Sequence, residues 1–339
     1  MASAGSRPHR RPKATDVAAR AGVSTATVSL VINGKTGGRV SKETEQRVRA
    51  AVAELGYVVD PAARSLVTGR RHCVALVAPD VANPFFSQVA SGVASALGTD
   101  YRLLLAVSGP ERDSPDLEQL VAFGVDGILL DFPGTAFDTE GLDCPLVLLD
   151  EPTGPTDRSR VYFDTRPGSQ QLVDRLVDLG HRQIVYMDAS RPGKSFDTRR
   201  KQVLGRLRRT QDGVLHRARS DLDLRAAREL VTESWPDWSA RGVTAIITAT
   251  DVLAYGTLSA LHDLNVAVPT QVSVAAFDDL PFAEITAPAL STVRLSAFDL
   301  GVESAQILRE HVEDRTLPPR TRSLDTRLVE RSSIGPAAG

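Results

Sequence analysis

The spacing of apolar positions changes near residue 72, and the two spacings predict two architectures within one chain of 339 residues. Before that point, apolar residues recur three and four apart, as in Val48, Ala51, Val52 and Leu55, which is the period of an amphipathic helix. After it, short apolar runs alternate with helical patterns. Because repeated β-α-β units imply parallel sheets covered by helices, we expect an all-α head followed by an α/β body.

The body is predicted to form two lobes. A stretch with proline and glycine at 151–159 separates two similar halves, which places the lobe boundary near 151–161, with later crossovers near 290 and 320. Two α/β lobes with a cleft between them are a common ligand-binding arrangement. The predicted strands are 73–80, 102–107, 125–131, 145–150, 161–164, 184–187, 245–248, 272–277, 292–295 and 324–330, and the predicted helices are 85–97, 116–123, 169–179, 198–209, 221–234, 252–264 and 298–314.

The head contains the pattern of a helix-turn-helix. Ala18 is small where two helices cross, Gly22 suits the tight turn because a positive φ costs glycine little, and Val28 packs back on the first helix. Ser24 is placed to cap the second helix. A helix-turn-helix lays its second helix in the major groove of DNA. A small helical bundle that carries such a turn is the alternative.

The distribution of charge favours a nucleic-acid partner. Residues 1–72 carry 13 Lys and Arg against 5 Asp and Glu, whereas the whole chain has a net charge of −2, so a cationic head is joined to an acidic body. The segment 7–13 has the composition of a basic arm that attracts phosphates. The head lacks the aromatic platforms typical of single-strand binders, so double-stranded DNA is the expected partner.

Other classes of function have less support. No apolar run approaches the ~20 residues of a membrane span and no signal peptide is recognisable, so a cytoplasmic protein without a membrane partner is expected. Cys73 and Cys144 lack metal-ligand spacing, and we expect no metal and no cofactor. Gly193-Lys194-Ser195 is similar to the end of a phosphate loop, but Asp188 stands where that loop needs glycine. An enzyme is therefore not expected. A cytoplasmic small-molecule binding protein without specific DNA regulation is the remaining alternative.

Several motifs together resemble the lactose-repressor (LacI/GalR) family over nearly the whole chain. In the head they are Asp16-Val17-Ala18, Gly22-Val23-Ser24, Thr27-Val28-Ser29, Asn33-Gly34, Val40-Ser41, Glu54-Leu55-Gly56-Tyr57 and Ala63-Arg64-Ser65-Leu66. In the body they are Pro79-Asp80, Asn83-Pro84-Phe85-Phe86, Val125-Asp126-Gly127-Ile128, Leu179-Gly180-His181-Arg182, Phe277-Asp278-Asp279, the run 288–293 and Arg327-Leu328-Val329-Glu330-Arg331. The resemblance implies a transcriptional repressor with a periplasmic-binding-protein-like body. A small polar effector, such as a sugar or sugar derivative, would control its affinity for operator DNA.

The resemblance also implies a domain plan and a set of DNA contacts. The plan is a basic arm 1–12, a helix-turn-helix domain 13–59, a hinge helix and linker 60–72, an effector-binding and dimerisation domain 73–334 and a tail 335–339. A homodimer on a pseudo-palindromic operator is implied, and the lack of a heptad tail predicts dimers rather than tetramers. The hinge would wedge a leucine, by position Leu66, into the minor groove. The DNA contacts expected by match are Ser24, Thr25, Ala26, Ser29, Leu30, Asn33, Arg39, Ser41, Ala63 and Leu66.

Leu30 departs from the family pattern, because many members have arginine at this position. With Ala26 it can offer only apolar contact, for instance to a thymine methyl group, whereas Thr25 can form hydrogen bonds. Packing on the core of the head is the alternative for Leu30.

The effector site implied by the match is a mixture of aromatic, charged and hydroxyl side chains. Aromatic rings would pack against one face of a polar ligand, while Asp and Arg would orient it by charge-assisted hydrogen bonds. Core packing is the alternative for the aromatic residues, and helix capping is the alternative for the two aspartates. Thr165, Thr250 and Gln202-Val203 differ from the usual family residues, which bears on the identity of the ligand. The expected residues are Phe85, Phe86, Asp164, Ser195, Arg199, Thr250 and Asp278.

Overall fold

The computed structural model describes residues 12–32, 34, 36–57, 70–107, 116–131, 142–190, 193–210 and 212–338. The chain divides into two compact units, Met1–Arg71 and His72–Gly339. Residues 1–11 of the predicted basic arm, residues 60–69 of the predicted hinge helix and linker, and three predicted DNA contacts (Asn33, Ala63 and Leu66) lie outside the described residues. Among the described residues, no helix is both long and apolar enough to cross a membrane.

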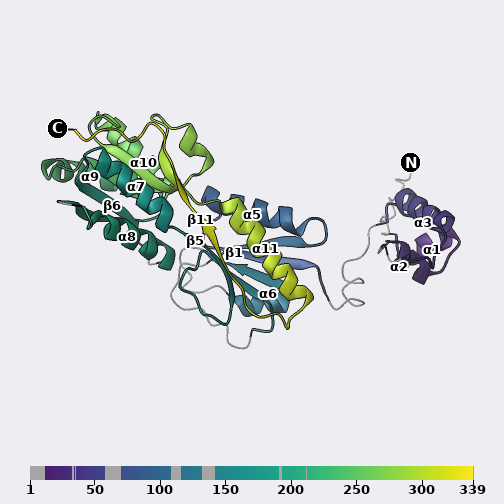
Figure 1. Ribbon diagram of the computed structural model, residues 1–339. Helices are drawn as coiled ribbons and strands as arrows, with labels where there is room; N and C mark the ends of the chain where they lie inside the picture. Colours follow the sequence, from purple (N-terminus) through teal and green to yellow (C-terminus); the bar gives the residue numbers. More distant parts are fainter. Residues whose placement is uncertain are drawn as a thin grey trace, which may run out of the picture. The chain divides into compact units, whose positions relative to one another are not determined.

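The head is all-α, as predicted, with the helices α1 (Ala14–Ala21), α2 (Thr25–Ile32) and α3 (Lys42–Leu55) (Figure 1). Gly22 ends α1 with a left-handed φ of 68°, a conformation that glycine adopts without steric cost. The Ser24 hydroxyl accepts a hydrogen bond from the Thr27 N–H at 3.1 Å, so it caps α2. The turn between the two helices is therefore held by the two residues that the sequence singled out for it.

The body contains two six-stranded sheets, one in each lobe. The first sheet is wholly parallel, with the order β11 (Thr321–Asp325), β5 (Ser159–Asp164), β4 (Leu146–Leu149), β3 (Gly127–Leu130), β1 (Cys73–Ala78) and β2 (Arg102–Val107). The second has the order β12 (Arg327–Val329), β10 (Ser291–Arg294), β9 (Ser273–Asp278), β8 (Ala245–Thr248), β6 (Gln183–Ala189) and β7 (Val214–Ser220), and only β12 runs antiparallel to its neighbour. The predicted fold class is confirmed.

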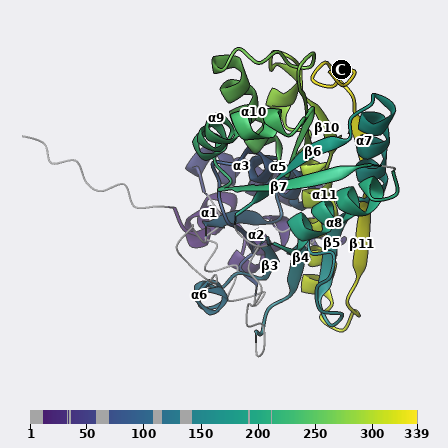
Figure 2. The ribbon, with the colours of Figure 1, turned by 90° about the vertical axis from the view of Figure 1, so that its left-hand side faces the viewer.

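Helices cover both faces of each sheet. In the first lobe, α5 (Pro84–Leu97) and α11 (Ala297–Glu313) lie on one face and α6 (Leu117–Phe123) on the other (Figure 1). In the second lobe, α9 (Leu224–Ala240) and α10 (Asp251–Asp263) lie on one face, and α7 (Arg166–Asp178) and α8 (Lys194–Leu207) lie on the other (Figure 2). A short 3-10 helix, η1 (Pro281–Glu284), follows β9.

Two glycines allow the backbones of α5 and α11 to approach closely. A Cβ atom on Gly92 would lie 2.0 Å from the carbonyl oxygen of Phe298, and one on Gly301 would lie 2.2 Å from that of Val89. Any side chain at either position would force the helices apart. The pair therefore fixes how α11, which follows the second crossover, packs on the first lobe.

The chain crosses between the lobes three times, and the first crossing corrects the predicted lobe boundary. β5 pairs with β4 and β11 in the first sheet, so the chain crosses at Thr165, between β5 and α7, and not within 151–161. The stretch 151–159 is a loop that joins two neighbouring strands of one sheet. The other crossings follow β10 and β11, in agreement with the predicted crossovers near 290 and 320.

The last crossing also divides a predicted element. The strand expected at 324–330 is two strands in different sheets, β11 and β12, separated by Thr326. The Thr326 hydroxyl donates to the carbonyl of Asp164 at 2.7 Å and accepts from the Gly168 N–H at 3.2 Å. Thr326, in the third crossing, is therefore hydrogen-bonded to residues on either side of the first crossing.

Two further elements differ from the prediction. β7 was not predicted, because this edge strand carries His216, Arg217 and Arg219 and lacks an apolar run. α9 continues to Ala240 through Pro236, beyond the predicted end at 234, and the buried Trp238 anchors the extra turn.

Candidate DNA-reading face and ligand cleft

The second helix of the head presents small polar and apolar side chains. Thr25, Ala26 and Ser29 are exposed on α2, and Leu30 is half-buried. The head's core is built from other side chains, chiefly Val17, Ala18, Ala21, Val28, Val31, Val48 and Ala51. Among the described residues, Leu30 is not one of those that pack in this core. The exposed part of α2 is compatible with the predicted contacts to base edges.

Two of the predicted contact residues already have a local structural role. The hydroxyl of Ser24 caps α2, and the hydroxyl of Ser41 caps α3 by accepting from the Thr44 N–H at 3.2 Å. Arg39 is exposed in the segment before α3. The positions of Asn33, Ala63 and Leu66 lie outside the described residues.

Arg199 is the centre of the cleft between the lobes. It lies on α8 of the second lobe, is only 3% exposed, and donates to the Ala249 carbonyl at 2.9 Å. It also donates to Asp278 of the same lobe at 3.2 Å and to Asp150 of the first lobe at 3.1 Å. The rings of Phe196 and Phe277 lie 5.2 and 5.8 Å from the guanidinium carbon. One buried cation therefore connects carboxylates of both lobes.

A second ion pair crosses the cleft beside the first. Lys194, in the first turn of α8, lies 3.3 Å from the carboxylate of Glu151, the residue after Asp150. Ser195 forms a side-chain hydrogen bond with Asp150. Three side chains at the start of α8, those of Lys194, Ser195 and Arg199, thus contact the first lobe.

The aspartates of the cleft have unusual backbone conformations. Asp150, Asp278 and Asp279 have φ values of 48°, 121° and 63°, which residues other than glycine rarely adopt. The loop after β9 is held by the buried Asp251, which accepts from the Leu280 N–H at 2.7 Å and from the Thr292 hydroxyl at 2.6 Å. Strain of this kind persists only where the surroundings impose it, and it is concentrated at functional sites.

Burial raises the pKa of three carboxyl groups in the cleft, those of Asp278, Asp150 and Asp131. It raises the pKa of Asp278 to about 7, although the nearby Arg199 lowers it. The pKa values of Asp150 and Asp131 are also raised by burial, and the charge of Asp150 adds to the shift at Asp131. Displaced pKa values of this kind are typical of ligand sites.

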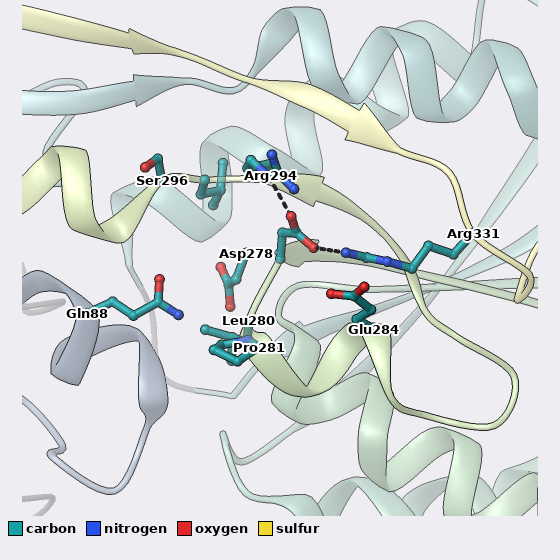
Figure 3. Close-up of a pocket in the computed structure, with 10 residues that line it drawn as sticks. Gln88, Asp278, Leu280, Pro281, Glu284, Arg294, Ser296 and Arg331 are labelled. Atoms are coloured by element: carbon teal, nitrogen blue, oxygen red, sulfur yellow. Dashed lines mark hydrogen bonds and ion pairs between the residues drawn. The ribbon is translucent and has the colours of Figure 1, made fainter.

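A pocket of about 390 Å³ opens on the Asp278 side of this cluster. Gln88 reaches it from α5 of the first lobe, while Asp278, Leu280 and Glu284 line it from the second (Figure 3). Asp279 also lines the pocket, and its carboxylate accepts from Arg294 at 2.5 Å and from Arg331 at 2.7 Å. The pocket is lined by both lobes, and its volume suits a small polar molecule.

The structure brings together some of the predicted effector residues and separates others. Ser195, Arg199 and Asp278 meet around Asp150. Thr250, next to the Ala249 carbonyl that Arg199 contacts, accepts from the Leu253 N–H at 3.4 Å and so caps α10. This contact shows a capping role for Thr250, and a role for any of these residues in ligand binding stays a prediction.

The two predicted phenylalanines differ in their surroundings. Phe85 is buried in the core, where its ring lies 6.3 Å from that of Phe163, and Phe86 is partly buried with its ring edge-on to Phe85. Asp164 accepts from the Arg166 N–H at 3.1 Å at the start of α7. These contacts correspond to the core and capping alternatives stated for Phe85 and Asp164.

The prediction missed Asp131 and Asp150. Each comes directly after a buried strand, β3 and β4, and the carboxyl ends of parallel strands meet at one edge of a sheet. That position along the sequence is the signal that could have identified them. Within the described residues, no group of His, Cys, Asp and Glu side chains has the arrangement of a metal site.

Comparison with known proteins shows which class of protein the chain resembles. Residues 14–60 match the family described as "Bacterial regulatory proteins, lacI family", and residues 173–334 match a "Periplasmic binding protein-like domain". The chain is 32% identical over 347 residues to the "HTH-type transcriptional regulator reg1" of Streptomyces lividans, covering 96% of this chain and 97% of that protein.

Solved structures agree with this result. A "transcriptional regulator CelR-cellobiose complex" is 28% identical, with a TM-score of 0.66, and the match covers 95% of this chain and all of that one. A lac repressor dimer bound to operator has the same fold, with a TM-score of 0.81 at 22% identity over 96% of this chain. The chain therefore belongs to the lacI family of bacterial regulatory proteins. It is a DNA-binding transcriptional regulator.

Proposed function

We propose that the cleft between the lobes binds a small polar effector, a sugar or sugar derivative, and that this binding changes the affinity of the head for operator DNA. The observation that carries the proposal is the position of Arg199, which is buried and bonded to Asp150 in one lobe and Asp278 in the other. A ligand that replaces Arg199 as the partner of Asp150 or of Asp278 changes the interactions between the two lobes. Such a ligand interacts differently with two arrangements of the lobes, which is the requirement for shifting an equilibrium between them.

The class of ligand is inferred from chemistry and likeness. Carboxylates and a guanidinium in a cleft form charge-assisted hydrogen bonds to hydroxyl groups, and they orient a polyol better than an apolar molecule. The similar CelR was solved with cellobiose. Both observations support a carbohydrate.

The DNA-reading side of the proposal concerns α2. Thr25 and Ser29 offer hydroxyl groups, while Ala26 and Leu30 offer apolar contact, so we infer that the half-site is read by thymine methyl contacts and a few hydrogen bonds. We further propose a homodimeric, non-enzymatic repressor that acts in the cytoplasm, where the DNA is. The likeness to an operator-bound dimer supports the same assembly.

The test begins with an operator selected from a random duplex library by the full chain. A thermal-shift screen with sugars, sugar phosphates and nucleobases then identifies a ligand, because a ligand that binds only the folded protein raises its melting temperature. Operator affinity is measured by fluorescence anisotropy with and without that ligand. We expect a change of at least about fivefold, the lower end of typical allosteric coupling.

The matched variant is Asp278→Asn, since asparagine also tolerates a left-handed backbone. We expect it to bind operator as the wild type does and to lose the response to ligand. A ligand that binds tightly and leaves operator affinity unchanged would favour a binding protein without regulation. A normal response of Asp278→Asn would remove Asp278 from the effector site.

A further inference from the structure

One N–H group of Arg199 takes no part in the contacts that this side chain makes with the two lobes. Nη1 donates to Ala249 and Asp278, and Nη2 donates to Asp150. Nε is buried and has no hydrogen-bond partner within the described part of the chain. A buried donor without an acceptor is costly, and buried polar groups in proteins nearly always have a partner. An acceptor other than a protein atom is therefore expected beside Nε.

The hydroxyl of Tyr186 is a second buried group of this kind. Tyr186 lies on β6 and is fully buried, and its hydroxyl also lacks a hydrogen-bond partner among the described residues. Burial raises the pKa of this hydroxyl, so it keeps its proton at neutral pH and can both donate and accept. The charge of Arg199 acts on Tyr186, and that of Tyr186 acts on Arg199. The two unsatisfied groups are thus within electrostatic reach of each other.

The second sheet and α8 place both side chains in one layer of the lobe. Side chains two residues apart on a strand point to the same face, so Tyr186 and Asp188 share one face of β6. Asp188 pairs with Arg200 of α8, so this is the face that α8 covers. Arg199, the residue before Arg200, donates to the carbonyl of Ala249 directly after β8, the strand beside β6. Tyr186 and the Arg199 guanidinium therefore lie on the same side of the sheet, between its strands and α8.

A single water molecule can satisfy both groups. Arg199 Nε and the Tyr186 hydroxyl are not in direct hydrogen-bond contact, so a bridge between them needs a further polar molecule. A buried water typically makes about three hydrogen bonds to groups that would otherwise be unsatisfied. It can accept from Nε–H and donate to the Tyr186 oxygen, and the carboxylate of Asp188, whose charge acts on Tyr186, is available for its second proton.

We propose that Tyr186 is a positioning residue for Arg199 and acts through one buried water molecule, which accepts a hydrogen bond from Nε–H and donates to the tyrosine hydroxyl. A guanidinium group is planar, so holding Nε also fixes the directions in which Nη1 and Nη2 point. These are the two nitrogens that reach Asp278 in one lobe and Asp150 in the other. The consequence for regulation rests on the proposed function, because an effector would replace Arg199 at one of these carboxylates.

The test is a double-mutant cycle of Tyr186→Phe and Arg199→Met in the full chain, measured by thermal unfolding. Both tryptophans, Trp235 and Trp238, lie on α9, so their fluorescence follows the second lobe. In the wild-type background Tyr186→Phe should lower the melting temperature by about 3 °C, because it removes the partner of a water bound to a charged group. In the Arg199→Met background it should lower the melting temperature by less than about 1 °C, because the group that Tyr186 positions is gone.

Tyr255→Phe is the matched control. The Tyr255 hydroxyl is also buried and has no hydrogen-bond partner in the described ranges, but the largest charge effect on it comes from Asp251 and not from Arg199. This variant should shift the melting temperature equally with and without Arg199. An equal shift for Tyr186→Phe in both backgrounds would overturn the proposal. A melting temperature that rises in Tyr186→Phe alone would do the same, because it would show that the hydroxyl has no partner.

A spectroscopic measurement tests the effect at the Nε–H group itself. The proton–nitrogen correlation signal of this group is identified by its absence in Arg199→Met. Tyr186→Phe should shift the signal, because it changes the hydrogen bonding of the water that accepts from Nε, whereas Tyr255→Phe should leave it in place. An unmoved signal in Tyr186→Phe would contradict the proposal whatever the melting temperatures show.

The outcomes separate this inference from the proposed function, because none of these measurements uses an effector. If Tyr186 and Arg199 are coupled and no ligand changes operator affinity, the positioning role stands and the regulatory role of the cleft fails. If a ligand changes operator affinity and the effects of the two substitutions are additive, the proposed function stands and the positioning role of Tyr186 is overturned.

Discussion

Replacing Arg199 by methionine should destabilise the protein by an amount that depends strongly on pH. Methionine retains an unbranched apolar stem but removes the charge that lies 3.1 Å from Asp150 and 3.2 Å from Asp278. Removing one partner of a buried ion pair costs about 3–5 kcal/mol, because the remaining charge is buried without compensation. Two carboxylates lose their partner here, so we expect a loss of about 4 kcal/mol at pH 8.

The loss of folding stability in Arg199→Met should be smaller at acidic pH than at pH 8. Burial already raises the pKa of Asp278 to about 7, and without Arg199 the pKa values of both carboxyl groups rise further. A carboxyl group whose pKa is higher in the folded than in the unfolded state stabilises the folded protein at low pH. This contribution is complete below the pKa of the unfolded state, about 4, and is lost as the pH rises through the pKa of the folded state. At pH 5 a larger fraction of both groups is neutral in the variant than at pH 8, so less uncompensated charge is buried. The cost should then fall toward that of the lost hydrogen bonds, about 2 kcal/mol.

The assay is urea unfolding of the wild type and Arg199→Met at pH 5 and pH 8. The control is Arg228→Met, which breaks the pair with Asp263 at 2.7 Å on the surface, where the two side chains are 50% and 47% exposed. Exposed pairs contribute about 1 kcal/mol or less, so the control should change little at either pH. An equal loss for Arg199→Met at both pH values would refute the reasoning, because it would show that the two carboxyl groups do not depend on Arg199 for their charge.

Three further predictions concern the head, the hinge and the packing of the first lobe. Operator affinity should fall at least about hundredfold between roughly 50 and 200 mM salt, measured by anisotropy, because a cationic head releases counterions from phosphates; a flat salt dependence would contradict it. Leu66→Ala should weaken specific operator binding and leave binding to random duplex nearly unchanged, since a minor-groove wedge acts only in the specific complex; equal losses would contradict it. Gly301→Ala should cost about 1–3 kcal/mol in urea unfolding, because the new Cβ would lie 2.2 Å from the carbonyl oxygen of Val89. Gly205→Ala in α8, with nothing within 4 Å, should be neutral or stabilising, and equal effects of the two alanines would contradict the close packing.

The alternation of apolar runs was sufficient to predict the fold class but not the assignment of every strand to a sheet. β5 was expected to begin the second lobe because a proline and glycine stretch precedes it, yet it pairs with β4 in the first. Composition marks a loop and does not show which strands the loop joins. β7 was missed for a different reason: an edge strand with charged side chains on it lacks the apolar run by which a buried strand is recognised.

The site was predicted in part, and the failures have physical causes. Arg199 and Asp278 were expected from family motifs, and they form a direct ion pair. Phe85 and Phe86 are adjacent in the first turn of α5, and only the ring of Phe85 is buried in the core. The motif does not show which of the two rings packs there. The contact between Asp150 and Arg199 joins residues 49 apart in different lobes, and only the three-dimensional structure shows it.

The most direct test of the account is the reciprocal measurement. A ligand that changes operator affinity must itself have its affinity changed by operator, and by the same factor, because the two binding free energies are linked. Once the effector is identified, its dissociation constant is measured by calorimetry on the free protein and on the protein saturated with operator. The account predicts that the two constants differ by the factor found for operator affinity with and without ligand. Equal constants would contradict the claim that the cleft between the lobes controls the DNA-binding head.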